Sequence, residues 1–147
     1  MEEYEFFYAD IEADSIFLSR YNVGDFIHAN NGVVASRLKG GLLTNCNVRF
    51  SFVPHPQGFL GYRVEDEDWK NQQLFIFDKD WRFKVEDRFF YDGVFQILMS
   101  HIDWEDFGEK KIIEAARKDF KKLYKQPPVD VLNNVEWKRR VRKVPGV

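Results

Sequence analysis

The sequence predicts an α+β fold in which a strongly bent antiparallel sheet of about eight strands, barrel- or sandwich-like, is covered by a C-terminal amphipathic helix. Short apolar or alternating segments separated by turn residues fill most of the chain, as in a meander of antiparallel strands. One segment near the end instead has apolar residues at helical spacing. About eight strands are too many for a flat open sheet, so we expect the sheet to curl into a barrel or divide into a sandwich.

The centre of the predicted sheet is the segment 73–92. Residues 74–77 (LFIF) are apolar on both faces, and 78–80 (DKD) form a turn signal. Apolar residues then alternate with charged ones from Trp81 to Glu86, which is typical of a half-buried strand. We therefore predict a hairpin in which the strands on either side of 78–80 pair with each other.

The segments before this hairpin are predicted to be strands joined by turns. Residues 4–11 are rich in aromatic side chains, which favour strands. A second strand begins at 16–18, and 26–29 and 33–38 flank an Asn-Asn-Gly turn that favours another hairpin. In the segment 48–52, apolar residues alternate with Arg49 and Ser51, so these two side chains are expected to face solvent.

The segments after the hairpin contain the predicted helix. Residues 94–102 fit a helix slightly better than a strand, because their apolar residues recur three and four positions apart. From Asp106 to Lys125, a capping signal and an apolar stripe predict an amphipathic helix that ends before two prolines. Residues 129–147 form a basic tail, for which helix and strand both remain open.

The composition indicates one soluble domain, 1–147, and a cytoplasmic protein. A single cysteine, Cys46, excludes an internal disulfide and fits a reducing compartment. The first residues are acidic and do not resemble a signal peptide. No stretch approaches the roughly 18 apolar residues of a membrane span. We therefore expect no association with a membrane.

Charge is divided unevenly along the chain, although the net charge is only −2. Residues 1–109 carry 10 Lys and Arg against 20 Asp and Glu, a balance of −10, whereas residues 110–147 carry 12 against 4, a balance of +8. Such a division indicates contact with a charged partner, or between the two parts of the same chain.

Weak catalytic candidates are the histidines and one nearby carboxylate. They are His28, His55, His101 and Asp103. Cys46 and His55 would lie roughly 30 Å apart if one strand joins them, which is too far for a nucleophile and its base. No two histidines have the local spacing of metal ligands, and no glycine-rich phosphate loop occurs. The sequence thus indicates no metal and no cofactor.

Binding candidates fall into two groups. If the sheet closes, Tyr62, Trp81 and Phe83, together with Phe52, could line a pocket for a small apolar ligand. The second group is basic and could contact phosphates while its one indole ring stacks on a base. It consists of Trp137, Lys138, Arg139, Arg140, Arg142 and Lys143.

The leading functional prediction is a non-enzymatic protein that acts through a protein partner or through self-association as a homodimer. The lack of a catalytic motif, the fifteen Phe among the aromatic residues and the divided charge favour it. One alternative is a ligand-binding protein or hydrolytic enzyme with a His and carboxylate pocket in the sheet. Another is nucleic-acid binding through the basic tail.

Overall fold

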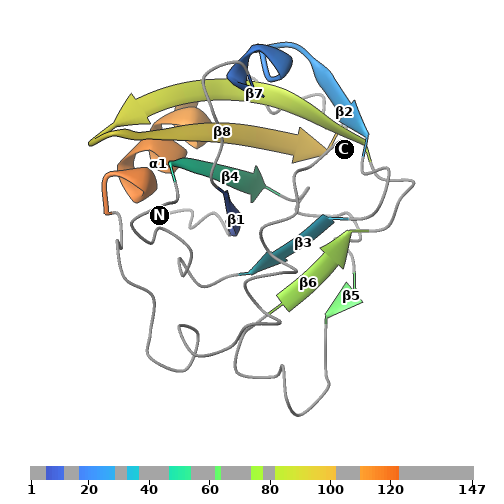
Figure 1. Cartoon of the computed structure of the whole chain (residues 1–147). Coiled ribbons are helices and arrows are strands. Elements are labelled where there is room, and N and C mark those ends of the chain that lie inside the picture. The colour runs from blue at the N-terminus through green and yellow to red at the C-terminus, as the bar shows by residue number, and fades with distance from the viewer. Residues whose placement is uncertain are drawn as a thin grey trace.

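A computed structural model of the chain describes most of the predicted strands and one helix (Figure 1). The described residues are 6–11, 17–28, 33–36, 47–53, 62–63, 74–77, 82–101 and 110–122. The strands are β1 (Phe7–Ile11), β2 (Phe26–His28), β3 (Val33–Ser36), β4 (Val48–Val53), β5 (Tyr62–Arg63), β6 (Leu74–Phe77), β7 (Arg82–Tyr91) and β8 (Val94–His101). The helices are the 3-10 helix η1 (Phe17–Arg20) and the α-helix α1 (Lys110–Phe120).

A five-stranded mixed sheet in the order β2-β7-β8-β4-β1 is the main part of the structure. β4 and β8 run parallel, in register from Val48 with Phe95 to Val53 with Ser100, while the other neighbours in this sheet are antiparallel. The strands β3, β6 and β5 follow β1 in the order of hydrogen bonding, and β3 joins β1 through the one register pair Tyr8 and Ser36.

The predicted fold class is wrong in three respects. The sheet is mixed, because a parallel pair lies at its centre. It is not a barrel of about eight strands, since the order of the described strands has two free ends, β2 and β5, which do not pair with each other. The predicted helix is present as α1, but it ends at Phe120 and is therefore not C-terminal.

Several local predictions are also wrong. β2 pairs with β7, and β3 pairs with β1 and β6, so the hairpin expected across the Asn-Asn-Gly turn does not form. The strand expected to begin at 16–18 is instead the 3-10 helix η1 from Phe17. β6 pairs with β3 and β5, whereas β7 pairs with β2 and β8, so the expected central hairpin does not form. The segment 94–101, expected as a helix, is the strand β8, which forms a hairpin with β7 around Asp92 and Gly93. Both turn residues have positive φ, 52° and 79°, which is the geometry of a tight hairpin turn with Asp-Gly.

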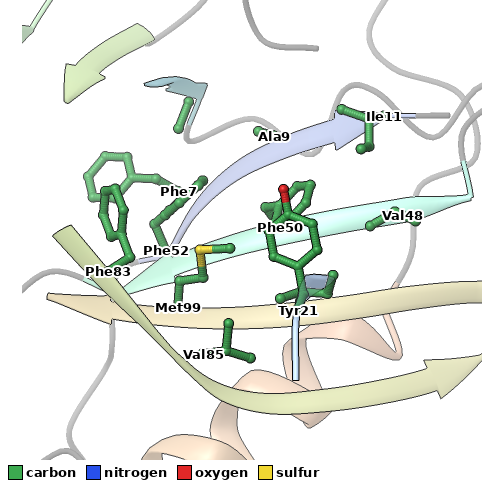
Figure 2. Close-up of a cluster of buried hydrophobic side chains, with 12 residues drawn as sticks. Phe7, Ala9, Ile11, Tyr21, Val48, Phe50, Phe52, Phe83, Val85 and Met99 are labelled. Atoms are coloured by element: carbon green, nitrogen blue, oxygen red, sulfur yellow. The ribbon is translucent and has the colours of Figure 1, made fainter. Parts of the chain in front are cut away.

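The larger core lies on the face of the mixed sheet opposite α1. Alternate residues of β1, β4, β7 and β8 meet there, and Tyr21, which follows η1, packs edge-on against Phe50 with ring centroids 5.0 Å apart (Figure 2). The members labelled in Figure 2 are Phe7, Ala9, Ile11, Tyr21, Val48, Phe50, Phe52, Phe83, Val85 and Met99. The period of two along each strand places their remaining residues on the face that α1 covers.

The helix α1 covers the other face of the sheet. Its residues Ile112 and Ala116, one turn apart, pack with Leu98 of β8 and with Tyr8 of β1. Phe120, one turn further, contacts Phe89 of β7 with ring centroids 5.9 Å apart. Neither described helix combines the length and apolar character needed to cross a membrane.

Candidate functional site

The predicted site residues are spread over the structure. His28 ends the edge strand β2 with an exposed side chain, and His101 ends β8. Tyr62 begins β5. Phe83 is buried in the larger core, where its ring centroid lies 5.0 Å from that of Phe52. The remaining predicted residues, His55, Asp103, Trp81 and the basic group within 137–143, lie outside the described residues.

The register of the sheet places the backbones of His28 and His101 on the two strands that flank β7. His28 is opposite Arg82, and His101 is opposite the next residue, Phe83. Two strand spacings separate them, which is about 10 Å. Among the described residues, no three His, Cys, Asp or Glu side chains are grouped so that they could hold a metal ion.

The described polar side chains that converge lie instead on the sheet face beneath α1. Asp10 of β1 and Arg49 of β4 are register partners, and Arg49 is in turn the register partner of Gln96 of β8. One step along the same face, Tyr8 is opposite Ser51. We call these five residues, Tyr8, Asp10, Arg49, Ser51 and Gln96, the polar cluster.

An ion pair lies at the centre of the polar cluster. The Arg49 guanidinium donates from Nε to Asp10 Oδ1 at 2.7 Å and from Nη2 to Asp10 Oδ2 at 3.2 Å. The side chains of Arg49 and Asp10 are 0% and 2% exposed. The guanidinium carbon also lies 5.0 Å from the centroid of the Tyr8 ring, within cation–π distance. Such a fully desolvated pair stabilises only because both charges and most donors are matched.

Two donors of the polar cluster have no acceptor among the described residues. Ser51 Oγ donates to Gln96 Oε1 at 3.0 Å, but Gln96 Nε2 and Arg49 Nη1 are buried without a hydrogen-bond partner. Both atoms belong to residues opposite each other on β4 and β8. Because both are N–H donors, their shared environment favours an oxygen acceptor, not a cation.

Hydrogen bonds join the sheet to α1 at two places, one of which is Tyr8 of the polar cluster. The Tyr8 hydroxyl donates to Asp119 Oδ2 at 2.6 Å. Burial, and then the neighbouring Asp119 carboxylate, raises the pKa of the Tyr8 hydroxyl well above its usual range. Further along the helix, Arg117 donates from Nε and Nη2 to Asp87 of β7, both at 2.9 Å. These bonds with Asp87 are the main cause of the raised pKa of Arg117.

The polar cluster fastens the helix to the sheet and is not open to a substrate. Its members are buried, and the Tyr8 hydroxyl bonds to Asp119 of α1. The sequence pattern did not reveal the cluster, because Arg49 and Ser51 alternate with apolar residues and so resembled solvent-facing positions. The sequence did contain one signal of the ion pair. Asp10 is an acidic residue within another aromatic-rich segment, 6–11, and could serve as the partner of Arg49.

The fold built on this mixed sheet resembles those of several solved structures, ADP-ribosyltransferases among them. The ATR domain of SpvB from Salmonella has a TM-score of 0.56 with 14% identity, over 70% of this chain and 64% of that one. The ADP-ribosyltransferase HopU1 of Pseudomonas syringae has a TM-score of 0.51 with 15% identity, over 68% and 45%. Exoenzyme S of Pseudomonas aeruginosa, solved with human 14-3-3 protein beta and bound to Carba-NAD, has a TM-score of 0.52 with 12% identity, over 78% and 58%.

These likenesses concern the fold, because the identities are low. The chain spans between 42% and 64% of the length of the solved structures it resembles. No protein-family model and no curated protein matches the sequence. The prediction of a non-enzymatic binding protein is nevertheless wrong, since structures that share this fold, HopU1 among them, are enzymes.

Proposed function

We propose that the chain is an ADP-ribosyltransferase domain that uses NAD. The observation that carries the proposal is the likeness of its fold to several ADP-ribosyltransferases, with TM-scores of 0.51 to 0.56 in the three structures described above. The binding of Carba-NAD by Exoenzyme S supports NAD as the dinucleotide. A fold can host more than one activity, so the activity needs its own test.

The proposed reaction exchanges one bond at the ribose. The bond between ribose C1′ and the nicotinamide nitrogen breaks, and a bond forms between C1′ and a nucleophilic atom of the acceptor. Nicotinamide leaves as a neutral molecule, and the proton of the nucleophile is released. A protein partner, which the divided charge of the chain predicts, would be the acceptor in this reaction.

No described side chain is assigned to NAD. The polar cluster offers donors that suit an oxygen acceptor, but Arg49 and Gln96 are 0% and 1% exposed beneath α1, so a dinucleotide does not fit there. Of the predicted catalytic candidates, His28 has a described and exposed side chain. His28→Ala, together with the corresponding changes at His55, His101 and Asp103, belongs in the assay below.

The test separates binding from transfer. The full chain is heated with NAD or with carba-NAD, and ligand at about 100 times its Kd should stabilise it by about 2.7 kcal/mol. That corresponds to a rise in melting temperature of roughly 5–11 °C at about 2–4 °C per kcal/mol. Transfer is then measured as nicotinamide release and as incorporation of biotin-labelled ADP-ribose into lysate proteins, with carba-NAD as the competitor.

The two measurements give distinguishable outcomes. Release of nicotinamide with labelling of a protein, both suppressed by carba-NAD, is the expected result. Thermal stabilisation by NAD without release of nicotinamide would leave a dinucleotide-binding domain and overturn the transferase. Absence of both stabilisation and release would overturn the proposal entirely.

A further inference from the structure

Two of the four large apolar side chains that are exposed among the described residues are neighbours at the end of β7. Phe90 and Tyr91 belong to β7 and are 56% and 40% exposed. Phe26, 57% exposed, is the β2 residue opposite Lys84 of β7. Val23, 62% exposed, precedes Gly24, whose N–H donates to the Val85 carbonyl of β7 at 2.8 Å. Val23 and Phe26 thus lie toward the other end of β7, whereas Phe90 and Tyr91 form a pair of adjacent exposed apolar side chains, which indicates a contact site.

The outer side of β7 is covered over only part of its length. β2 pairs with Arg82 to Lys84. Two further bonds on this side, both at 2.8 Å, join Val85 N–H to the Asp25 carbonyl and Gly24 N–H to the Val85 carbonyl. Among the described residues, none pairs through its backbone with the rest of β7 on the side away from β8. We call this segment, Glu86 to Tyr91, the β7 edge. At 3.3 Å per residue it is about 20 Å long, and its outward N–H and C=O groups can pair with another strand.

Each face of the β7 edge carries an aromatic pair beside a cation. On one face, Phe90 packs against Phe95 with ring centroids 4.6 Å apart, and the Arg88 guanidinium lies 5.6 Å from the Phe95 ring. On the other face, Phe89 and Tyr91 are parallel with centroids 6.3 Å apart, and Lys121 Nζ lies 5.9 Å from the Phe89 ring.

The two carboxylates of the β7 edge itself already have partners. Glu86 accepts a hydrogen bond from Ser100 Oγ at 2.7 Å, and Asp87 accepts two from Arg117. Lys121 and its neighbour Lys122 are exposed, and neither forms an ion pair with a described residue. Lys121 therefore places an exposed cation at the end of the β7 edge next to α1, where it complements an acidic group of a ligand.

We propose that the β7 edge binds an extended segment of a partner protein as an added β-strand, and that this segment carries two neighbouring apolar residues beside acidic ones. Neighbouring residues of a strand point to opposite faces, so one apolar residue would contact Phe90 and the other Tyr91. The acidic residues would lie nearer to Arg88 and Lys121. Backbone pairing supplies affinity in this mode, and the side chains supply specificity.

A second copy of the chain suits the β7 edge less well. In a symmetric antiparallel pairing over the whole edge, residue 86 is opposite 91 and residue 87 is opposite 90. The two acidic residues of the edge would then face the two exposed aromatic residues, and the aromatic residues would not meet each other. The proposal does not depend on the proposed activity, because no residue of the β7 edge is assigned to NAD.

The experiment selects peptides from a random library displayed on phage, using the full chain as the target. Recovered peptides should be rich in adjacent apolar residues and in Asp or Glu, and a synthetic version should bind the wild-type chain. Tyr91→Ser should weaken this binding by about tenfold or more, a change readily resolved in a titration. Its thermal unfolding should match that of the wild type, because the side chain of Tyr91 is partly exposed.

A charge reversal with a matched control tests the cationic end. Lys121→Glu should weaken binding of the acidic peptide several-fold, and less so at high salt. Lys111→Glu makes the same change on an exposed residue about 15 Å away along the helix, at 1.5 Å per residue, and should leave binding unchanged. Equal effects of the two variants would show a general charge effect and overturn the assignment to this edge.

Methylation of the peptide backbone tests strand addition itself. The bound peptide turns every second N–H toward β7, so N-methylation of one alternating set should abolish binding, and N-methylation of the other set should preserve it. Equal loss with both sets would indicate apolar adhesion and overturn the proposal. Recovery of basic peptides, of none, or of a dimer of the chain that Tyr91→Ser dissociates would overturn it as well.

Discussion

Replacing Asp10 by asparagine should destabilise the protein more than the loss of an ordinary ion pair. The substitution keeps the shape of the side chain and removes its charge. Arg49 then remains ionised at 0% exposure, without its counter-ion. Removing one partner of a buried pair costs about 3–5 kcal/mol, because the other charge stays buried and uncompensated. An exposed pair is worth about 0.2–1 kcal/mol.

The expected loss is a large share of the total free energy of unfolding. Folded domains are stable by about 5–15 kcal/mol, so Asp10→Asn removes between a fifth and most of that margin. The melting temperature should fall by roughly 6–20 °C, at about 2–4 °C per kcal/mol. Urea unfolding of wild type and variant, followed by tryptophan fluorescence, gives the difference in the free energy of unfolding.

A double-substitution cycle separates the interaction energy of the ion pair from the cost of burying each charge alone. Arg49→Met alone should cost a similar amount, because it leaves the Asp10 carboxylate without the guanidinium. The double variant Asp10→Asn with Arg49→Met removes both charges and should be more stable than either single variant by several kcal/mol. A loss below about 1 kcal/mol for Asp10→Asn, or a double variant that loses the sum of the single losses, would refute the reasoning.

Three further predictions follow from the sheet and its helix. Tyr8→Phe should cost about 1.5–3 kcal/mol at neutral pH, because it removes a hydrogen bond to the Asp119 carboxylate. The folded state raises the pKa of the Tyr8 hydroxyl. The stabilisation that this hydroxyl provides is therefore complete below the unfolded pKa of about 10 and is lost progressively as the pH rises above that value. In a series of urea unfolding curves, stability should fall at alkaline pH less steeply in Tyr8→Phe than in wild type. Arg117→Ala should cost about 1 kcal/mol of stability, because Arg117 is 44% exposed. Arg117→Lys should not restore this stability, because the lysine ammonium cannot make both hydrogen bonds to Asp87. Gly93→Ala should cost about 1–2 kcal/mol from backbone strain alone, because φ is +79° and an added Cβ meets nothing within 4 Å. The thermal melt of the Gly93 variant should show this loss relative to wild type without a change in the heat capacity of unfolding.

The sequence indicated several strands but not their partners. The prediction of a hairpin between 74–77 and 81–86 assumed that neighbours in sequence pair in space, as they do in many antiparallel sheets. In the structure, β6 and β7 belong to different parts of the sheet. No local pattern encodes this, because the partner of each strand is set by contacts with residues far away in the chain.

The segment 94–101 shows why periodicity alone misjudged a buried strand. Both faces of β8 are covered, one by the larger core and the other by α1. Apolar residues are then allowed at every position, and a spacing of three and four appears by chance in a short segment. The amphipathic pattern of α1, in contrast, was readable because one face of the helix stays in water: Lys111 and Lys118 are exposed, while Ile112 and Ala116 are buried.

The divided charge of the chain has part of its explanation within the fold. α1 begins the basic part, and its Arg117 pairs with Asp87 of the acidic part. Asp119, one of the two acidic residues of α1, accepts a hydrogen bond from the Tyr8 hydroxyl of the sheet. The contacts between α1 and the sheet therefore include a carboxylate of the helix as well as a cation. Lys121 and Lys122 are exposed at the end of α1, and Lys121 lies beside the Phe89 ring of β7. An exposed cation thus lies next to a segment of β7 with which no other described strand pairs on its outer side, so an acidic partner strand would gain from both.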